Sequence, residues 1–195
     1  MSSFAKLTLV RHAPTPATRR HAFPLDESLD ETGRAEAAAL LGKLQAAEVV
    51  AAPVERCRET AALAGFGPTR TDPRWGELDF GDWAGSTLRE IGERDPERLQ
   101  SWLDDPRSAP PGGESLSDLT ARVREALGEL GEAGADTAVF TSGGPIKAAV
   151  VTALGAPDAA FWRLDVHPCS ITVLHCHGGT WTVRGVNALP GGGPR

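Results

Sequence analysis

Near its start the chain reads Lys6-Leu7-Thr8-Leu9-Val10-Arg11-His12-Ala13-Pro14, a short run of β-formers that ends in a cation, an imidazole and a proline. β-branched and apolar residues favour a buried strand, and proline stops sheet pairing. We therefore expect a strand over 6–10, with Arg11 and His12 placed at its carboxyl end.

Strands and helices alternate from there. We expect a helix of about four turns from a Ser28–Glu31 capping box onward, a second strand over 48–52, and then a helix that begins at Pro53. A helix with the apolar stripe Leu116 to Leu130 precedes a third core strand over 137–141. Strands over 170–174 and 181–184, joined by Gly178-Gly179, form a terminal hairpin. This order predicts a three-layer α/β/α sandwich with a mostly parallel central sheet.

Length favours one domain, over residues 1–190, with an insertion at about 65–113 and a flexible tail at 191–195. The insertion is rich in proline and glycine and holds most of the tryptophans, so we expect loops and short helices there rather than core sheet. Such a segment is a natural lid or pocket wall.

Composition narrows the partners and the compartment. The formal net charge is −6 and no Lys/Arg run forms a basic patch, which argues against nucleic-acid and membrane-surface binding. No apolar stretch is long enough to span a bilayer, the start of the chain does not resemble a secretion signal, and three cysteines do not make a disulfide framework. A cytoplasmic location follows as the expectation.

Three strand-to-helix junctions would meet at the carboxyl edge of the sheet. They carry Arg11-His12, Arg56 and the Ser142-Gly143-Gly144 turn. Guanidinium groups and a helix amino terminus are receptors for a phosphate group. Between such cations His12 would stay neutral and could attack phosphorus; a histidine bonded to a loop carbonyl is the structural alternative.

Glu77 is the candidate proton donor. Trp75, Phe80 and Trp83 surround it in sequence with apolar surface, which favours the protonated form of a carboxylic acid. Asp79 and Asp82 compete for the role, and a surface glutamate is the plain alternative.

The run Leu9 to Thr15 resembles the signature of the histidine phosphatase superfamily, the phosphoglycerate-mutase-like proteins. Further matches follow in order and cover nearly the whole chain: Leu29 with Gly33, Ala52-Pro53 with Arg56 and Thr60, and the run 77–85. Residues 111–115 followed by Arg122 are similar to the α-ribazole phosphatase branch. The resemblance implies a phosphoglycerate-mutase-like fold and a phosphatase for small phosphorylated metabolites.

Carried over by residue, the resemblance implies His12 as nucleophile, Glu77 as general acid, and Arg11 and Arg56 as phosphate ligands, with Thr15 as a supporting contact. It also implies no metal and no dissociable cofactor. The turn residues Ser142 and Gly143 complete the expected phosphate site.

Two residues depart from the family pattern. Ala13 stands where the family has a glycine, which could crowd the turn. Ser142 stands where the family has a second histidine, and a hydroxyl adds no positive charge. Loss of one preorganised donor typically costs about 10²–10³ in rate, so we expect reduced activity or compensation, for example by His21.

Alternatives follow from these departures. One is a phosphoglycerate mutase, although Pro16-Ala17-Thr18 lacks the asparagine that mutases of the family place there. Another is a phosphate-binding module without turnover, because of Ser142.

His175 and His177, on one strand face, make an incomplete metal site with Cys169 or Cys176. The physiological substrate and the oligomeric state stay open.

Overall fold

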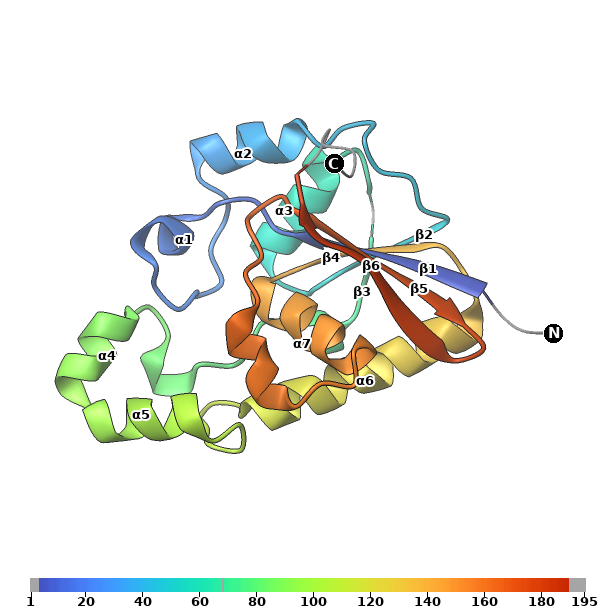
Figure 1. The fold of residues 1–195 in the computed structure, drawn as a ribbon. Helices are drawn as coiled ribbons and strands as arrows, with labels where there is room; N and C mark the ends of the chain where they lie inside the picture. The colour runs from blue at the N-terminus through green and yellow to red at the C-terminus, as the bar shows by residue number, and fades with distance from the viewer. Residues whose placement is uncertain (1–3, 68, 190–195) are drawn as a thin grey trace.

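One mixed sheet forms the centre of the computed structural model, whose described residues are 4–67 and 69–189 (Figure 1). In the described part, the strand order is β3-β2-β4-β1-β5-β6. β1 pairs parallel with β4, and β2 pairs parallel with β3 and β4, while β5 runs antiparallel to β1 and β6. The strands are β1 (Phe4–Arg11), β2 (Glu48–Ala51), β3 (Arg70–Thr71), β4 (Thr137–Thr141), β5 (Ile171–His177) and β6 (Thr180–Ala188).

Helices cover both faces of this sheet, which confirms the three-layer α/β/α sandwich. In Figure 1, α2 and α3 lie above the sheet and α6 and α7 below it, with α4 and α5 at one end. The helices are α1 (Pro16–Arg20), α2 (Glu31–Ala38), α3 (Glu55–Leu63), α4 (Leu88–Arg94), α5 (Pro96–Asp104), α6 (Leu116–Ala133) and α7 (Gly143–Ala153). Short 3₁₀ segments are η1 (Pro73–Trp75), η2 (Gly81–Trp83) and η3 (Asp158–Arg163).

The apolar core divides along the two faces of the sheet. Side chains alternate along a strand, so Leu7 and Leu9 join the apolar cluster of α6 and α7, whereas Val10 joins the cluster of α2 and α3. All three are fully buried. This burial on both faces holds the end of β1, and therefore Arg11 and His12, at a defined place.

The expected helix after Ser28 is wrong in start and length. It begins after Asp30, whose carboxylate accepts the Gly33 N–H at 2.6 Å, and it ends at Ala38. Gly33 brings the helix against the loop after His12, since a Cβ there would lie 2.1 Å from the Pro14 carbonyl oxygen. Likewise α3 begins at Glu55, two residues after the expected Pro53.

The insertion at 65–113 contains α4, α5 and two 3₁₀ segments, as expected, but also β3, which extends the sheet beside β2. β3 is an exposed, two-residue strand at the edge of the sheet and not core sheet, and so short a strand leaves no periodic signal in the sequence. Two loops of this region touch at glycines: a Cβ on Gly81 would lie 2.1 Å from the Pro111 carbonyl oxygen, and one on Gly113 would lie 2.4 Å from that of Asp79.

The terminal hairpin is confirmed as β5 and β6. His175 packs edge-to-face on Phe4 with ring centroids 5.4 Å apart. Within residues 4–67 and 69–189, no group of three or more His, Cys, Asp or Glu side chains could hold a metal ion. Cys57, Cys169 and Cys176 are buried free thiols. The expected tail at 191–195 lies outside the described residues.

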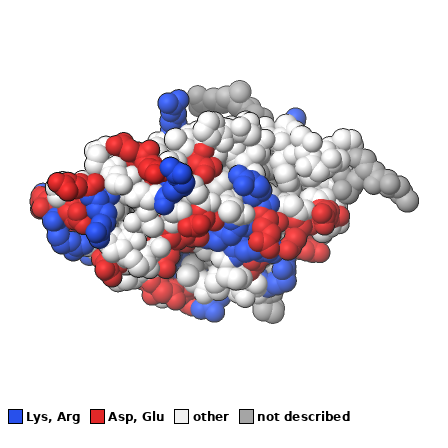
Figure 2. All heavy atoms as spheres, turned by 90° about the horizontal axis from the view of Figure 1, so that it is seen from below, with Lys and Arg blue, Asp and Glu red and all other residues white. Residues whose placement is uncertain are grey.

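Surface charge and helix hydropathy bear on the expected partners. Among the described residues, every helix is too short or too polar to cross a bilayer. On the face that Figure 2 shows, Lys and Arg are interspersed with Asp and Glu, and no continuous basic patch covers it.

Candidate active site

His12 directly follows β1 and is 4% exposed. Its Nδ1 lies 2.7 Å from the carbonyl oxygen of Ala13. A carbonyl only accepts, so in the neutral ring Nδ1 carries the proton and Nε2 carries the free lone pair. Burial, followed by the charges of Arg56 and Arg11, lowers the pKa of His12 to about 3. The imidazole is therefore neutral at physiological pH.

Arg11 and Arg56 flank His12 with guanidinium groups that are only partly satisfied. Arg11 donates through Nη1 to the Val166 carbonyl, and Arg56 through Nη1 to the Leu25 carbonyl at 2.7 Å. The Nε atoms of both are buried without a hydrogen-bond partner among the described residues. Burial lowers the pKa of Arg11. Two buried cations with free donors around one imidazole are suited to an anion; we call Arg11, His12 and Arg56 the phosphoryl floor.

Thr60 joins the two chain segments that build this floor. Its hydroxyl donates to the Arg56 carbonyl at 2.7 Å and accepts the Ala13 N–H at 3.1 Å. The loop after β1 is thereby tied to α3. Ala13 is not among the described non-glycine residues that have a positive φ. Its backbone conformation is therefore one that alanine adopts without strain. The expected crowding by the Ala13 side chain stays a prediction.

Glu77 reaches the same edge from the insertion. Its carboxylate accepts the Leu78 N–H at 2.8 Å and the Gly144 N–H at 3.2 Å. A Cβ on Gly144 would lie 2.0 Å from Glu77 Oε1, so glycine is needed for this approach. Asp79 instead accepts the Gly81 N–H at 2.9 Å and, like Asp82, does not line the pocket described below.

Arg122 of α6 holds the backbone of the segment that carries Glu77. It donates to the carbonyl oxygens of Gly76 at 2.9 Å and Glu77 at 3.1 Å. Glu114 fixes the guanidinium group in turn, at 2.7 Å. The Glu114 and Arg122 match noted in the sequence thus corresponds to a clamp on the Glu77 loop, a role that the sequence alone did not indicate.

Two neighbouring residues of the turn after β4 have different surroundings. Gly143, at the start of α7, lines the pocket and packs against Arg11, whose Nε would lie 3.6 Å from a Cβ at this position. Ser142 is fully buried beside the Cys57 thiol, whose pKa burial raises to about 12. The Ser142 side chain is not part of the pocket lining.

Thr15 and His21 both serve α1 rather than the pocket. The Thr15 hydroxyl accepts the Thr18 N–H at 3.2 Å as the helix cap and donates to Glu27 at 2.9 Å. His21 ends the helix with a positive φ of 53°. The pocket lining includes neither residue.

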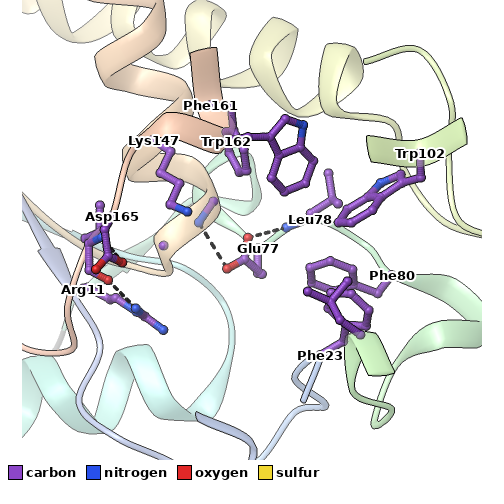
Figure 3. Close-up of a pocket in the computed structure, with 14 residues that line it drawn as sticks. Arg11, Phe23, Glu77, Leu78, Phe80, Trp102, Lys147, Phe161, Trp162 and Asp165 are labelled. Atoms are coloured by element: carbon purple, nitrogen blue, oxygen red, sulfur yellow. Dashed lines mark hydrogen bonds between the residues drawn. The ribbon is translucent and has the colours of Figure 1, made fainter. Parts of the chain in front are cut away.

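A pocket of about 200 Å³ opens beside Arg11 and Glu77. Figure 3 shows Arg11, Lys147 and Asp165 on one side of it, with Glu77 between them and a group of aromatic rings on the other side. We call Phe23, Phe80, Trp102 and Trp162 the aromatic wall. The insertion was expected to form a pocket wall, and Phe80 and Trp102 belong to it. Sequence reasoning missed Lys147 and Asp165 as site residues, although Lys147 lies three and four residues after Gly144 and Gly143, a helical spacing that could have indicated it. The remaining lining residues are Leu78, Leu88, Gly143, Gly144, Phe161 and Val166.

Fold and site together define an α/β protein in which two arginines flank a neutral histidine at the carboxyl ends of parallel strands. The chain belongs to the histidine phosphatase superfamily (branch 1), whose family model matches residues 7–189. The phosphoglycerate-mutase-like fold expected from the sequence is confirmed.

Similar proteins agree with this membership. A bifunctional protein of Mycobacterium tuberculosis (strain ATCC 25618 / H37Rv) is 34% identical, over 93% of this chain and 53% of its own. This chain thus spans about half the length of the first curated relatives it matches. The structure of mycobacterial glucosyl-3-phosphoglycerate phosphatase with VO3 has a TM-score of 0.83 at 31% identity, covering 94% of this chain and 98% of that one. A putative alpha-ribazole-5'-P phosphatase from Escherichia coli (str. K-12 substr. MG1655) shares the fold, with a TM-score of 0.84 at 24% identity, covering 95% and 98%.

Proposed function

We propose that this chain is a phosphomonoesterase that releases phosphate from a small phosphorylated metabolite through a phosphohistidine on His12. The observation that carries the proposal is the neutral, buried imidazole between two guanidinium groups, with Nδ1 bonded to the Ala13 carbonyl. Membership in the superfamily and the phosphatase relatives support it. No metal or dissociable cofactor takes part in the proposed reaction.

In the first step, the Nε2 lone pair attacks phosphorus and the ester P–O bond breaks. Protonated Glu77 transfers its proton to the leaving oxygen, so an alcohol departs and a phosphohistidine remains. Arg11 and Arg56 bind the equatorial phosphoryl oxygens, where negative charge is spread in the transition state. The N–H groups at the start of α7, including that of Gly143, add partial positive charge.

In the second step, the Glu77 carboxylate accepts a proton from water as the water oxygen attacks the phosphohistidine. The N–P bond breaks, inorganic phosphate leaves, and His12 and protonated Glu77 are restored. The position of Glu77 supports its part in the reaction, because two backbone N–H groups hold its carboxyl group at the pocket that Arg11 also lines.

Thr15 and Ser142 enter the proposal differently from the other predicted ligands. We assign Thr15 a positioning role, since its hydroxyl is committed to the α1 cap and Glu27. Ser142 is buried at the turn against Cys57, and its hydroxyl, which has no hydrogen-bond partner among the described residues, adds no positive charge to the phosphoryl floor. The buried serine also favours the alternative of a module that binds phosphate without turnover.

Hydrolysis of p-nitrophenyl phosphate separates these functions. We expect turnover by the wild-type chain and none by His12→Ala, while His177→Ala, an exposed histidine in β5, keeps full activity. Quenching during turnover in alkaline denaturant, in which the P–N bond of phosphohistidine survives, should trap phosphate on His12. Calorimetric binding of inorganic phosphate without any release from the ester would support the binding module instead. Interconversion of phosphoglycerates faster than phosphate release would support a mutase.

A further inference from the structure

Lys147 is a half-buried cation whose charge lies near the carboxylates of Glu77 and Asp165 without a direct ion pair to either. It lies on the same face of α7 as Gly143 and Gly144, and in Figure 3 its ammonium group points into the pocket towards Glu77. Among the described residues, none forms an ion pair or hydrogen bond with Nζ, which sits 5.1 Å from the centre of the Phe161 ring. A half-buried ammonium group that lines a pocket with its hydrogen-bond donors free is suited to bind a ligand there.

The pocket lining and the surrounding charges distinguish Lys147 from the phosphoryl floor. Glu77, Asp165 and Arg11 act on the pKa of Lys147, which burial lowers. The pKa of His12, in contrast, responds to Arg56 and Arg11. Arg11 and Lys147 line the pocket, whereas His12 and Arg56 do not. Lys147 therefore lies on the pocket side of Arg11, where the alcohol part of a phosphoester bound to His12 would extend.

The other residues of the pocket indicate the chemical character of that alcohol. The aromatic wall faces the charged side, with Trp102 and Trp162 rings 4.7 Å apart and Phe23 and Phe80 rings 4.1 Å apart. Such surface receives a ring or another apolar carbon skeleton. A single ammonium is a point charge that matches a monoanion, whereas a second phosphate favours a guanidinium fork. Asp165 and Glu77 nearby oppose more negative charge.

We propose that Lys147 is a specificity-determining residue that binds a carboxylate on the alcohol part of the substrate, while the aromatic wall holds its carbon skeleton. This inference rests on the proposed phosphomonoesterase function. The carboxylate accepts hydrogen bonds from the Lys147 ammonium, and no covalent step involves the lysine.

Matched aryl phosphates test the proposal. Phenyl phosphate, 3- and 4-carboxyphenyl phosphate and their neutral carbamoyl analogues present the same ring with and without the charge. In Lys147→Met, we expect kcat/KM to fall about 10- to 100-fold for at least one carboxyphenyl isomer, mainly through KM, as for loss of a charge-assisted hydrogen bond. The neutral esters should change less than about threefold, a spread typical of sites outside the contact.

Control variants separate charge from structure. Lys147→Arg keeps the charge and should restore most of the preference, and Lys43→Met, at an exposed lysine, should leave it unchanged. An unchanged thermal midpoint in Lys147→Met shows that α7 still packs. Equal losses for charged and neutral esters, or no loss for any, would overturn the proposal.

A failure of the proposed phosphatase function can be distinguished from a failure of the proposed carboxylate site. If the wild-type chain hydrolyses none of these esters, binding of 3- and 4-carboxybenzyl phosphonate, which cannot be hydrolysed, is measured by calorimetry. Binding that Lys147→Met weakens at least tenfold, with benzyl phosphonate unaffected, would keep the carboxylate site and reject the phosphatase function. Binding that is independent of Lys147 would reject the site.

Discussion

The phosphoryl floor and the aromatic wall differ in how they are built, although one floor residue, Arg11, lines the same pocket as the wall. The floor is polar and buried, with two guanidinium groups that lower the pKa of His12 and keep Nε donors unpaired. The wall is apolar and its rings pack on one another, with Trp102 only 3% exposed. The reacting groups therefore lie in a region that adds little to the stability of the fold, whereas the aromatic rings that stabilise the fold take no part in the reaction.

Removing the wall should affect stability most. Trp102 contacts the rings of Phe23, Phe80, Trp83 and Trp162. We expect Trp102→Ala to reduce the free energy of unfolding by about 3–5 kcal/mol, the usual cost of a large buried aromatic. Urea denaturation measures it, and Trp102→Phe should lose less than half as much. A loss below about 1 kcal/mol in Trp102→Ala would show that the wall does not stabilise the fold.

Removing a cation of the phosphoryl floor should reduce activity but not stability. We expect Arg56→Met to lower kcat/KM for p-nitrophenyl phosphate by about 10²–10³, as for one preorganised donor. Its free energy of unfolding should stay equal or rise, because a buried cation near Arg11 and His12 is removed. Arg58→Met changes an exposed, Glu55-paired residue of the same helix and should leave the rate unchanged. Unfolding of Arg56→Met at ordinary temperature would contradict the contrast between floor and wall.

The pH dependence of stability tests the floor in a second way. The pKa of His12 is lowered from 6.5 to about 3, so the unfolded chain binds the extra proton between those values. Stability from this group is complete above pH 6.5 and falls on acidification, by up to about 1.4 kcal/mol per pH unit. Between pH 6.5 and 5, wild type should lose about 2 kcal/mol more than His12→Asn. Equal slopes in denaturation at the two pH values would reject the buried neutral imidazole, and His177→Asn serves as the control.

Substitution of Thr15 has the smallest expected effect and distinguishes a helix-capping role from a role as phosphate ligand. As the cap of α1, its loss in Thr15→Ala should cost about 1 kcal/mol of stability. The rate on p-nitrophenyl phosphate should stay within a factor of about three, a small change for a residue outside the reacting atoms. Thr15→Ser keeps the hydroxyl and should restore the stability. A rate loss of tenfold or more in a folded Thr15→Ala would instead make Thr15 a phosphate ligand.

Prediction from sequence worked best where local patterns suffice. The strand over 6–10, the turn at Ser142 and the terminal hairpin follow from periodicity, proline and glycine, and the structure contains all three. The helix after Ser28 was wrong because Asp30 is the cap, a choice among nearby polar residues that depends on packing against Pro14. The strand β3 was missed because two residues carry no pattern.

By itself, the sequence determined the order of strands and helices and the residues at the ends of the parallel strands, because hydrophobic period and turn chemistry act over a few neighbouring residues. Arg11, His12 and Arg56 could be found in that way. Only the tertiary structure decided that Thr60 ties Ala13 to α3, that Arg122 clamps the Glu77 loop, and that Lys147 faces the aromatic wall. These contacts join residues far apart in the chain, and their distances are set by how helices pack on the sheet.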